Sequence, residues 1–196
     1  MAGPYTHYLL ADQYADSHDT DRALFVAGSL LPDIRYLGVV GRQASHPDVS
    51  LLSQVTSTDD PLWAGVLYHA YVDHVTEQIR HDAYDLACLH SYPLASVALK
   101  IAEDRFFASF SGSKNEAKHL LTTPSTNPFG VAQTDVERWY ELTRTILNDF
   151  TETKLRQYLV ALSFRETEAD EVIRLSHDED VVRAVAVYTP HFNSFI

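Results

Sequence analysis

The chain has 196 residues, of which 45% are hydrophobic and 21% charged, so it is long enough for one domain with a sizeable core. Its formal net charge of −12 argues against binding to a nucleic acid duplex or an anionic membrane, since both need a basic surface. The single cysteine, Cys88, excludes an intrachain disulfide framework and a cysteine-based zinc site. Neither a signal peptide nor an apolar run of membrane-spanning length is evident, so we expect a cytoplasmic protein without a transmembrane segment.

Glycine is scarce, with 7 residues, and no long stretch alternates between apolar and polar residues as a strand does. We therefore expect an all-α fold, a multi-helix bundle that forms a single helical domain over residues 1–196. The predicted helices, in chain order, span 4–16, 19–31, 61–88, 94–110, 114–121, 134–151, 153–163, 166–175 and 178–187.

The first helix begins at Pro4, a residue that suits the first helical turn. His7 lies in this turn and, taken alone, is expected to be a surface or capping residue. The second helix is predicted to stop at Pro32, and Asp33 follows directly. Asp33 can serve a turn, or it can be presented from a rigid corner to the core.

A long irregular connection is predicted between residues 37 and 60, and loops of this length within compact domains are often functional. His46 lies in this connection. A histidine in a loop is usually solvated, but here the following Pro47 stiffens the backbone beside it.

The apolar run 62–75 has the length and period of a buried helix, and it contains His69 and Asp73. These residues are four apart, so they share one helix face. A histidine and a carboxylate that face a core are costly unless they pair with each other or bind a metal, and both groups suit zinc. Arg80 continues the same face as a candidate phosphate contact, or as an exposed charge near a helix end.

The predicted helix 94–110 carries two adjacent acids within an apolar sequence. We expect Glu103 to point inward. Asp104 lies four residues after Lys100, and this spacing is typical of an exposed ion pair on a helix surface.

Four elements follow one another along the first part of the chain: Thr6-His7, Gly28 to Asp33, Ser45-His46, and His69-Ala-Tyr-Val-Asp73. Their order and local sequences resemble the zinc-dependent phospholipase C family, which shares its fold with P1 nuclease. The resemblance covers about residues 3 to 81, so residues 1–112 would supply the metal-site helices and residues 113–196 additional helices packed on them.

The resemblance implies an all-α bundle with a trinuclear zinc site at the bottom of a cleft. By position, the implied metal ligands are His7, Asp33, His46, His69 and Asp73, and the last of these would bridge two ions. It also implies hydrolysis of a small phosphoester or a phospholipid head group by a metal-bound hydroxide, with Asp73 and Asp33 as catalytic residues. Arg80, on the helix face of His69, is the candidate substrate contact.

The chain departs from the family at two places. It begins Met-Ala-Gly-Pro, where secreted members begin with a tryptophan that binds zinc, and it has no later His-xxx-Glu motif. His81 is therefore included as a candidate ligand, and His74, His90 or Glu103 could also complete the site. We expect one to three zinc ions, with another divalent metal as an alternative.

Two other functions are compatible with the sequence. One is a non-catalytic helical protein with a vestigial or structural metal site. The other is an HD-type metal phosphohydrolase that uses His46, His81-Asp82 and a later aspartate. The sequence leaves the substrate and the oligomeric state open.

Overall fold

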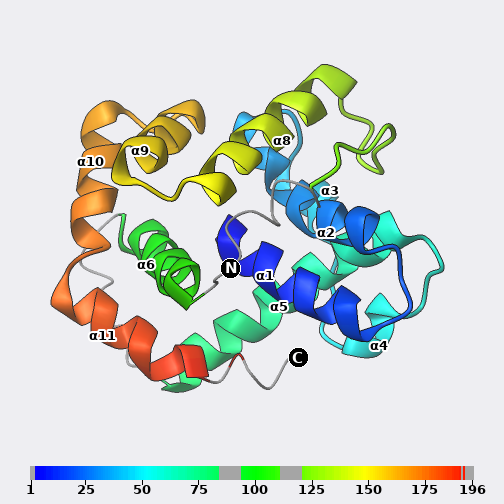
Figure 1. Cartoon of the computed structure of the whole chain (residues 1–196), viewed down its shortest axis with the longest axis horizontal. Helices are drawn as coiled ribbons and strands as arrows, with labels where there is room; N and C mark the ends of the chain where they lie inside the picture. Colours follow the sequence, from blue (N-terminus) through cyan, green and yellow to red (C-terminus); the bar gives the residue numbers. More distant parts are fainter. Residues whose placement is uncertain (1–2, 84–93, 111–120, 191, 193–196) are drawn as a thin grey trace.

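The computed structural model describes residues 3–83, 94–110, 121–190 and 192 (Figure 1). Within these residues all regular secondary structure is helical and there is no strand, which confirms the predicted all-α class. None of the described helices combines the length and the hydropathy needed to cross a lipid bilayer. The predicted helix 114–121, the end of the predicted helix 61–88, His90 and most of the C-terminal tail lie outside the described residues.

The helix boundaries lie close to those predicted from the sequence. In chain order the elements are α1 (Pro4–Ser17), α2 (Arg22–Leu30), η1 (Leu31–Leu37), α3 (Arg42–Ser45), α4 (Leu52–Val55), α5 (Pro61–Ala83), α6 (Ala95–Phe110), α8 (Gln133–Asn148), α9 (Glu152–Ala161), α10 (Glu166–Leu175) and α11 (Glu179–Tyr188). The predicted irregular connection 37–60 thus contains two short helices.

The segment after α2 differs from the prediction, because Pro32 does not stop the helical path. The α-helix ends at Leu30, and the chain continues directly into the 3₁₀ helix η1, with Pro32 in its first turn. Proline lacks the N–H that a first turn leaves unbonded anyway, so it is compatible with this position. As a result Asp33 is buried, with 7% of its surface exposed, rather than placed in a solvated turn.

Helices α2 and α5 cross with their backbones in contact, and two glycines make this possible. A Cβ atom on Gly28 would overlap the carbonyl oxygen of Leu62, and one on Gly65 would overlap the carbonyl oxygen of Phe25. Because neither residue has a Cβ, the helices approach more closely than larger side chains allow. This crossing sets α5 beside the end of α2 and the start of η1.

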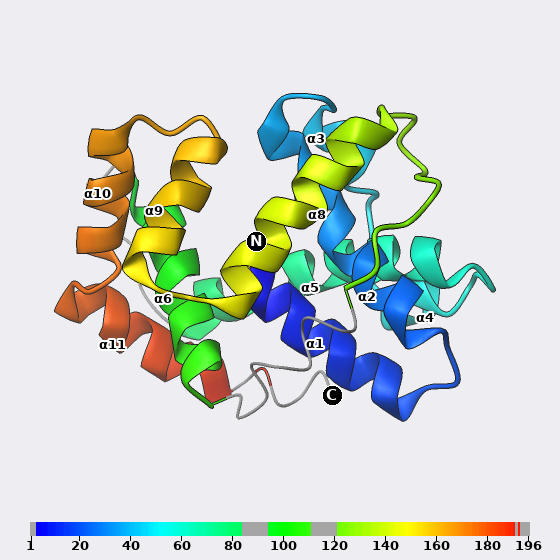
Figure 2. The ribbon, with the colours of Figure 1, turned by 45° about the horizontal axis from the view of Figure 1, so that its top comes forward.

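The C-terminal helices pack on the N-terminal ones and share a core with them (Figure 2). On α8, the Trp139 indole N–H donates to the carbonyl oxygen of Leu30 (2.8 Å), and the Tyr140 hydroxyl donates to that of Ala27 (2.7 Å). Both side chains are fully buried. The end of α2 is therefore held from one side by α5 and from another by α8.

Helix α6 corrects one prediction and confirms another. Glu103 points inward as predicted and is fully buried, but Asp104 and Lys100 do not form an exposed pair. Asp104 is also fully buried and accepts hydrogen bonds from α1, while Lys100 donates to the Tyr36 hydroxyl (3.1 Å). The physical reason is that α1, α10 and α11 all pack on α6, so little of its surface is left for solvated ion pairs.

Candidate metal centre

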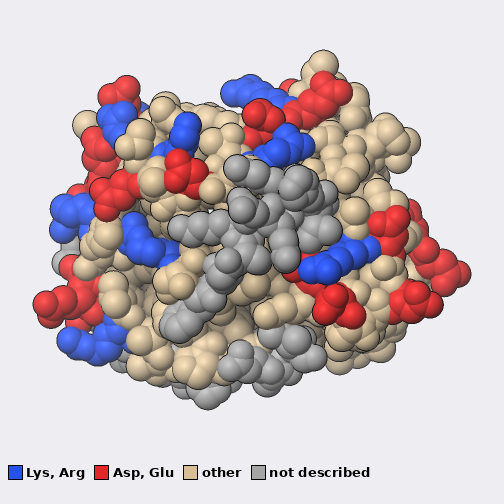
Figure 3. All heavy atoms as spheres, viewed as in Figure 1, with Lys and Arg blue, Asp and Glu red and all other residues tan. Residues whose placement is uncertain are grey.

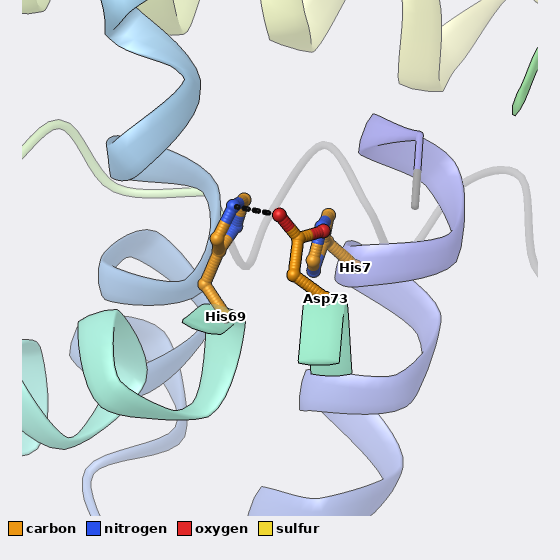
Figure 4. Close-up of side chains that lie close together, drawn as sticks. All are labelled: His7, His69 and Asp73. Carbon is orange, nitrogen blue, oxygen red and sulfur yellow. Dashed lines mark ion pairs between the residues drawn. The ribbon is translucent and has the colours of Figure 1, made fainter. Parts of the chain in front are cut away.

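Five of the predicted ligands converge from four parts of the chain. His7 comes from α1, Asp33 from η1, His46 from the residue after α3, and His69 and Asp73 from α5. Their ligand atoms form two groups that could hold a metal ion, His7–His69–Asp73 and Asp33–His46–His69. Figure 4 shows His7 of α1 close to His69 and Asp73 of α5, with a dashed line from the His69 imidazole to the Asp73 carboxylate.

His69 is held in one orientation by the helix crossing. Its Nδ1 lies 2.7 Å from the carbonyl oxygen of Ser29, which can only accept, so Nδ1 carries the proton and donates. The lone pair of the ring is then on Nε2, which faces the other ligands. A backbone carbonyl behind a histidine is a common arrangement around metal-binding imidazoles, because it fixes both the tautomer and the ring plane.

His46, the residue that follows α3, faces the Nε2 atom of His69. Its Nδ1 lies 2.8 Å from the hydroxyl oxygen of the buried Ser45, and its Nε2 lies 3.2 Å from the Nε2 of His69. Two zinc–nitrogen bonds of about 2.0–2.1 Å at a tetrahedral angle place their nitrogens roughly 3.3 Å apart. The separation of the two Nε2 atoms therefore suits a shared ion.

Asp73 turns its two carboxylate oxygens toward different histidines. Oδ1 lies 3.3 Å from His7 Nε2, whereas Oδ2 lies 3.7 Å from His46 Nε2 and 3.9 Å from His69 Nε2. Oδ2 also lies 3.7 Å from the Arg42 guanidinium. One carboxylate can thus contribute to two neighbouring cation positions.

Asp33 completes the side of the site nearest His46. Its Oδ1 lies 3.8 Å from His46 Nε2 and 3.4 Å from Arg35 Nε. Burial alone would raise the pKa of Asp33, but the nearby cations Lys100 and Arg35 oppose this effect, and the pKa stays below its ordinary value. The carboxyl group is therefore ionised, as a metal ligand must be.

His7 provides the best test of whether this site suits a cation. Only 1% of the residue is exposed, and its ring stacks on that of His69 with the centroids 3.7 Å apart. Among the described residues, neither ring nitrogen of His7 makes a well-directed hydrogen bond. A buried polar atom in this state is costly, and a metal ion at its lone pair removes that cost. The donor set and this buried imidazole both fit a divalent ion.

Burial also keeps the two remaining histidines neutral. It lowers the pKa of His46 to about 4 and that of His69 to about 3, because the charged imidazolium loses its hydration inside the protein. Neutral imidazole is the form that binds metals. Protons therefore do not compete for these two nitrogens near neutral pH.

These shifts predict that the metal-free protein loses stability as the pH falls below 6.5. The unfolded chain then takes up protons at His46 and His69 that the folded protein cannot, down to about pH 4 for His46 and about pH 3 for His69. Each histidine should contribute about 1.4 kcal/mol per pH unit to the fall in the free energy of unfolding. Urea denaturation between pH 7 and pH 5, with a chelator present, measures this slope.

The variant His46→Gln isolates one of the two contributions. Between pH 6 and pH 5, we expect the free energy of unfolding of this variant to fall less steeply than that of the wild type. The difference should be about 1.4 kcal/mol per pH unit, the effect of one proton. All other titrating groups are common to both proteins, so the comparison removes their effects. Equal slopes would contradict the neutral, buried state of His46.

Two predicted site residues lie elsewhere. His81 is exposed on α5, about two turns beyond Asp73, and belongs to neither ligand group among the described residues. Arg80 was expected to contact phosphate or to be exposed, but it is 5% exposed and its Nη2 lies 2.6 Å from Glu103 Oε2. The reason is that Glu103 of α6 supplies a buried carboxylate to the guanidinium. The Asp82 side chain lies outside the described structure.

An open pocket of about 760 Å³ adjoins the ligands. It is bounded by the segment 42–49 and by α5, and it is lined by Arg42, Gln43, His46, Pro47, Asp48, Val49, Ala70, Asp73, His74 and Glu77. His46 and Asp73 belong both to the ligand groups and to the pocket wall. A molecule in the pocket can therefore reach the candidate metal centre.

Arg42 is the residue at this site that the sequence did not indicate. It is the basic side chain of the pocket lining, half exposed, and its guanidinium reaches Asp73. The sequence held one signal, because Arg42 precedes His46 by four residues and this spacing places both on one face if the segment is helical. The segment was predicted to be irregular, and in an irregular segment residues four apart do not share a face.

On the face shown in Figure 3, Lys and Arg side chains lie beside Asp and Glu side chains instead of forming a continuous basic area. Comparison with known proteins gave no match to a family model, a curated protein or a solved structure.

Proposed function

We propose that the protein is a phosphoester hydrolase that depends on divalent metal, with zinc as the favoured ion. The observation that carries the proposal is the Asp73 carboxylate, whose two oxygens face different histidines at the wall of an open pocket. Imidazole nitrogens and carboxylate oxygens together are a typical zinc donor set, although they also bind other divalent metals.

The ligands divide unequally between two positions. Asp33, His46 and His69 would hold one ion with Oδ2 of Asp73, whereas His7 and Oδ1 of Asp73 would hold a second. His69 has only one free ring nitrogen, because Nδ1 donates to Ser29, so it can serve one ion at a time. We therefore expect a tight position with four protein ligands and a weaker one that depends on His7.

Divalent ions in such sites act as Lewis acids toward water and toward phosphate oxygens. The chain itself supplies the placement of the substrate. Arg42 lines the pocket wall beside Asp73, so its guanidinium would lie next to a phosphate group bound there. A guanidinium matches the geometry of phosphate oxygens. In this proposal Arg42 takes the phosphate-binding role first given to Arg80.

Metal analysis of protein purified without chelator tests the first part of the proposal. We expect up to two zinc ions per chain in the wild type and a loss of metal in His69→Ala. His81→Ala is the matched control, since His81 is an exposed histidine on the same helix, and it should retain the wild-type content. A panel of phosphomonoesters and phosphodiesters with added zinc then tests the activity.

The result of this pair of measurements separates the proposal from its rivals. Metal without hydrolysis of any substrate favours a non-catalytic protein with a structural metal site. Metal loss in His81→Ala favours an HD-type arrangement. The absence of both metal and activity contradicts the proposal.

Replacing Arg42 by Gln should lower kcat/KM for a phosphodiester by about tenfold, because a cation next to the phosphate is lost from a half-exposed site. The metal content should stay the same, since no arginine nitrogen binds a cation. Steady-state kinetics on the best substrate of the panel measures the change.

Two further variants control for nonspecific effects on the pocket. Gln43→Ala changes a neighbouring uncharged residue of the same lining and should leave kcat/KM within about twofold of the wild type. Arg42→Lys keeps the charge and should recover part of the loss. If Arg42→Gln and Gln43→Ala behave alike, Arg42 has no specific role toward phosphate.

A further inference from the structure

Helix α1, which carries His7, lacks a cap of its own. Its N-cap residue is Gly3, which has no side chain, and Pro4 follows without an N–H group. The next two N–H groups, those of Tyr5 and Thr6, have no partner within the helix because the first turn of any helix leaves its donors free. A donor buried in this state must be satisfied from elsewhere in the protein.

Asp104 of α6 supplies that partner from about a hundred residues away. Its Oδ2 accepts from the Tyr5 N–H (3.1 Å), and its Oδ1 accepts from the Thr6 N–H (2.9 Å) and the Thr6 hydroxyl (2.8 Å). The carboxylate is fully buried. A negative charge at a helix N-terminus is also favourable to the helix dipole.

The close fit around this carboxylate shows that the contact replaces a local cap. Gly3 lies directly against Asp104, and a Cβ atom on Gly3 would overlap the carboxyl group. Serine or aspartate, the usual N-cap residues, would therefore displace the Asp104 carboxyl group from its place at position 3. The two ways of capping α1 compete with each other.

The capped turn leads directly into the candidate metal centre. His7 follows Thr6, and its own N–H donates to the Gly3 carbonyl (3.0 Å). Its ring stacks on His69, and its Nε2 lies 3.3 Å from Asp73 Oδ1. Any shift of the first turn of α1 moves this ring with it, because His7 is part of that turn.

We propose that Asp104 is a positioning residue that fixes the first turn of α1 and thereby holds His7 against Asp73 and His69. The functional consequence rests on the proposed metal site: α6, which contributes no ligand to either group, sets the affinity of the weaker ion position. The structural consequence, an ordered first turn and a fixed His7 ring, is independent of any metal.

The neighbouring acid on α6 gives a matched control. Glu103 is as buried as Asp104, and its Oε2 accepts from Arg80 of α5. Glu103→Gln should therefore lower the stability without a selective effect on His7. Burial raises the pKa of Asp104 to about 7, so the comparison is made at pH 8, where the carboxylate is charged.

The first experiment uses metal-free protein. In Asp104→Ala we expect the amide hydrogens of Tyr5 and Thr6 to exchange about tenfold faster, the effect of a lost helix cap. The nuclear Overhauser contact between the rings of His7 and His69 should weaken. Asp104→Asn, which keeps one acceptor oxygen, is expected to lie between this variant and the wild type and serves if the alanine variant does not fold.

The second experiment uses titration with zinc. Asp104→Ala should weaken the second, weaker ion by about tenfold and leave the first unchanged, since only the former depends on His7. Glu103→Gln should change neither selectively. If wild type binds no second ion, the proposed function fails at this position, while the ring contact and the amide exchange still decide the role of Asp104.

A double variant distinguishes positioning from general stability. Gly3→Ser alone should disturb the first turn, because the new Cβ meets the Asp104 carboxyl. Combined with Asp104→Ala, the serine has space and can cap α1 locally, so the ring contact and the second zinc affinity should recover. The proposal is overturned if Asp104→Ala leaves His7 and the Tyr5 and Thr6 amides unchanged, or if the double variant is no better than Asp104→Ala.

Discussion

Replacing Asp73 by Asn is expected to lower the rate of phosphoester hydrolysis by much more than about tenfold, because both ion positions lose a ligand that they share. The amide keeps the shape of the carboxylate but replaces one oxygen by a donor NH₂ group. Whichever way it is oriented, either His7 or the pair His46 and His69 then faces a group that cannot bind a cation. Activity and metal content, measured on the same samples, should fall together.

Asp48→Asn provides the comparison for this variant. Asp48 is an exposed carboxylate that lines the same pocket and belongs to neither ligand group among the described residues. Its replacement changes the pocket charge by the same amount as Asp73→Asn, so it should cost little activity and no metal. If the two variants lose activity equally, the effect of Asp73 is one of general charge, and the shared-ligand role is wrong.

The helices and the local part of the site could be predicted because they depend on short spacings. The apolar run 62–75 predicts a buried helix by its period, and the spacing of His69 and Asp73 places both on one face of it. The structure has both features in α5. The convergence of Asp33 and His46 with them was expected only from the order of motifs, since no local rule brings residues 33, 46 and 69 together.

The errors arose where a distant partner replaced a local one. The spacing of Lys100 and Asp104 predicts a surface pair, but Asp104 bonds to Thr6, 98 residues away. Likewise Arg80, at the end of an amphipathic pattern, pairs with Glu103, 23 residues away. Both contacts form only in the folded protein, where α6 packs on α1 and brings Glu103 within reach of Arg80. Of these charged residues only Glu103 was predicted to point inward, and the sequence alone does not identify the partners of Asp104 and Arg80.

The roles of Gly28 and Gly65 also depend on residues distant in the sequence, because they follow from a contact between two helices and not from a turn. Replacing Gly28 by Ala should lower the free energy of unfolding by about 3 kcal/mol, the upper part of the range for overpacked cores. Alanine favours a helix by about 1 kcal/mol relative to glycine, so the sign of the effect tests the crossing directly. Denaturant unfolding measures it.

The same substitution should reach the metal centre. Its Cβ meets the backbone of Leu62, so α5 must move away from α2, and the bond from His69 Nδ1 to the Ser29 carbonyl lengthens. We therefore expect Gly28→Ala to weaken the tighter ion as well. Gly41→Ala is the control, because a Cβ there meets nothing within 4 Å, and it should change the stability by less than about 0.5 kcal/mol. A Gly28→Ala protein as stable as the wild type would show that α2 and α5 do not touch through their backbones.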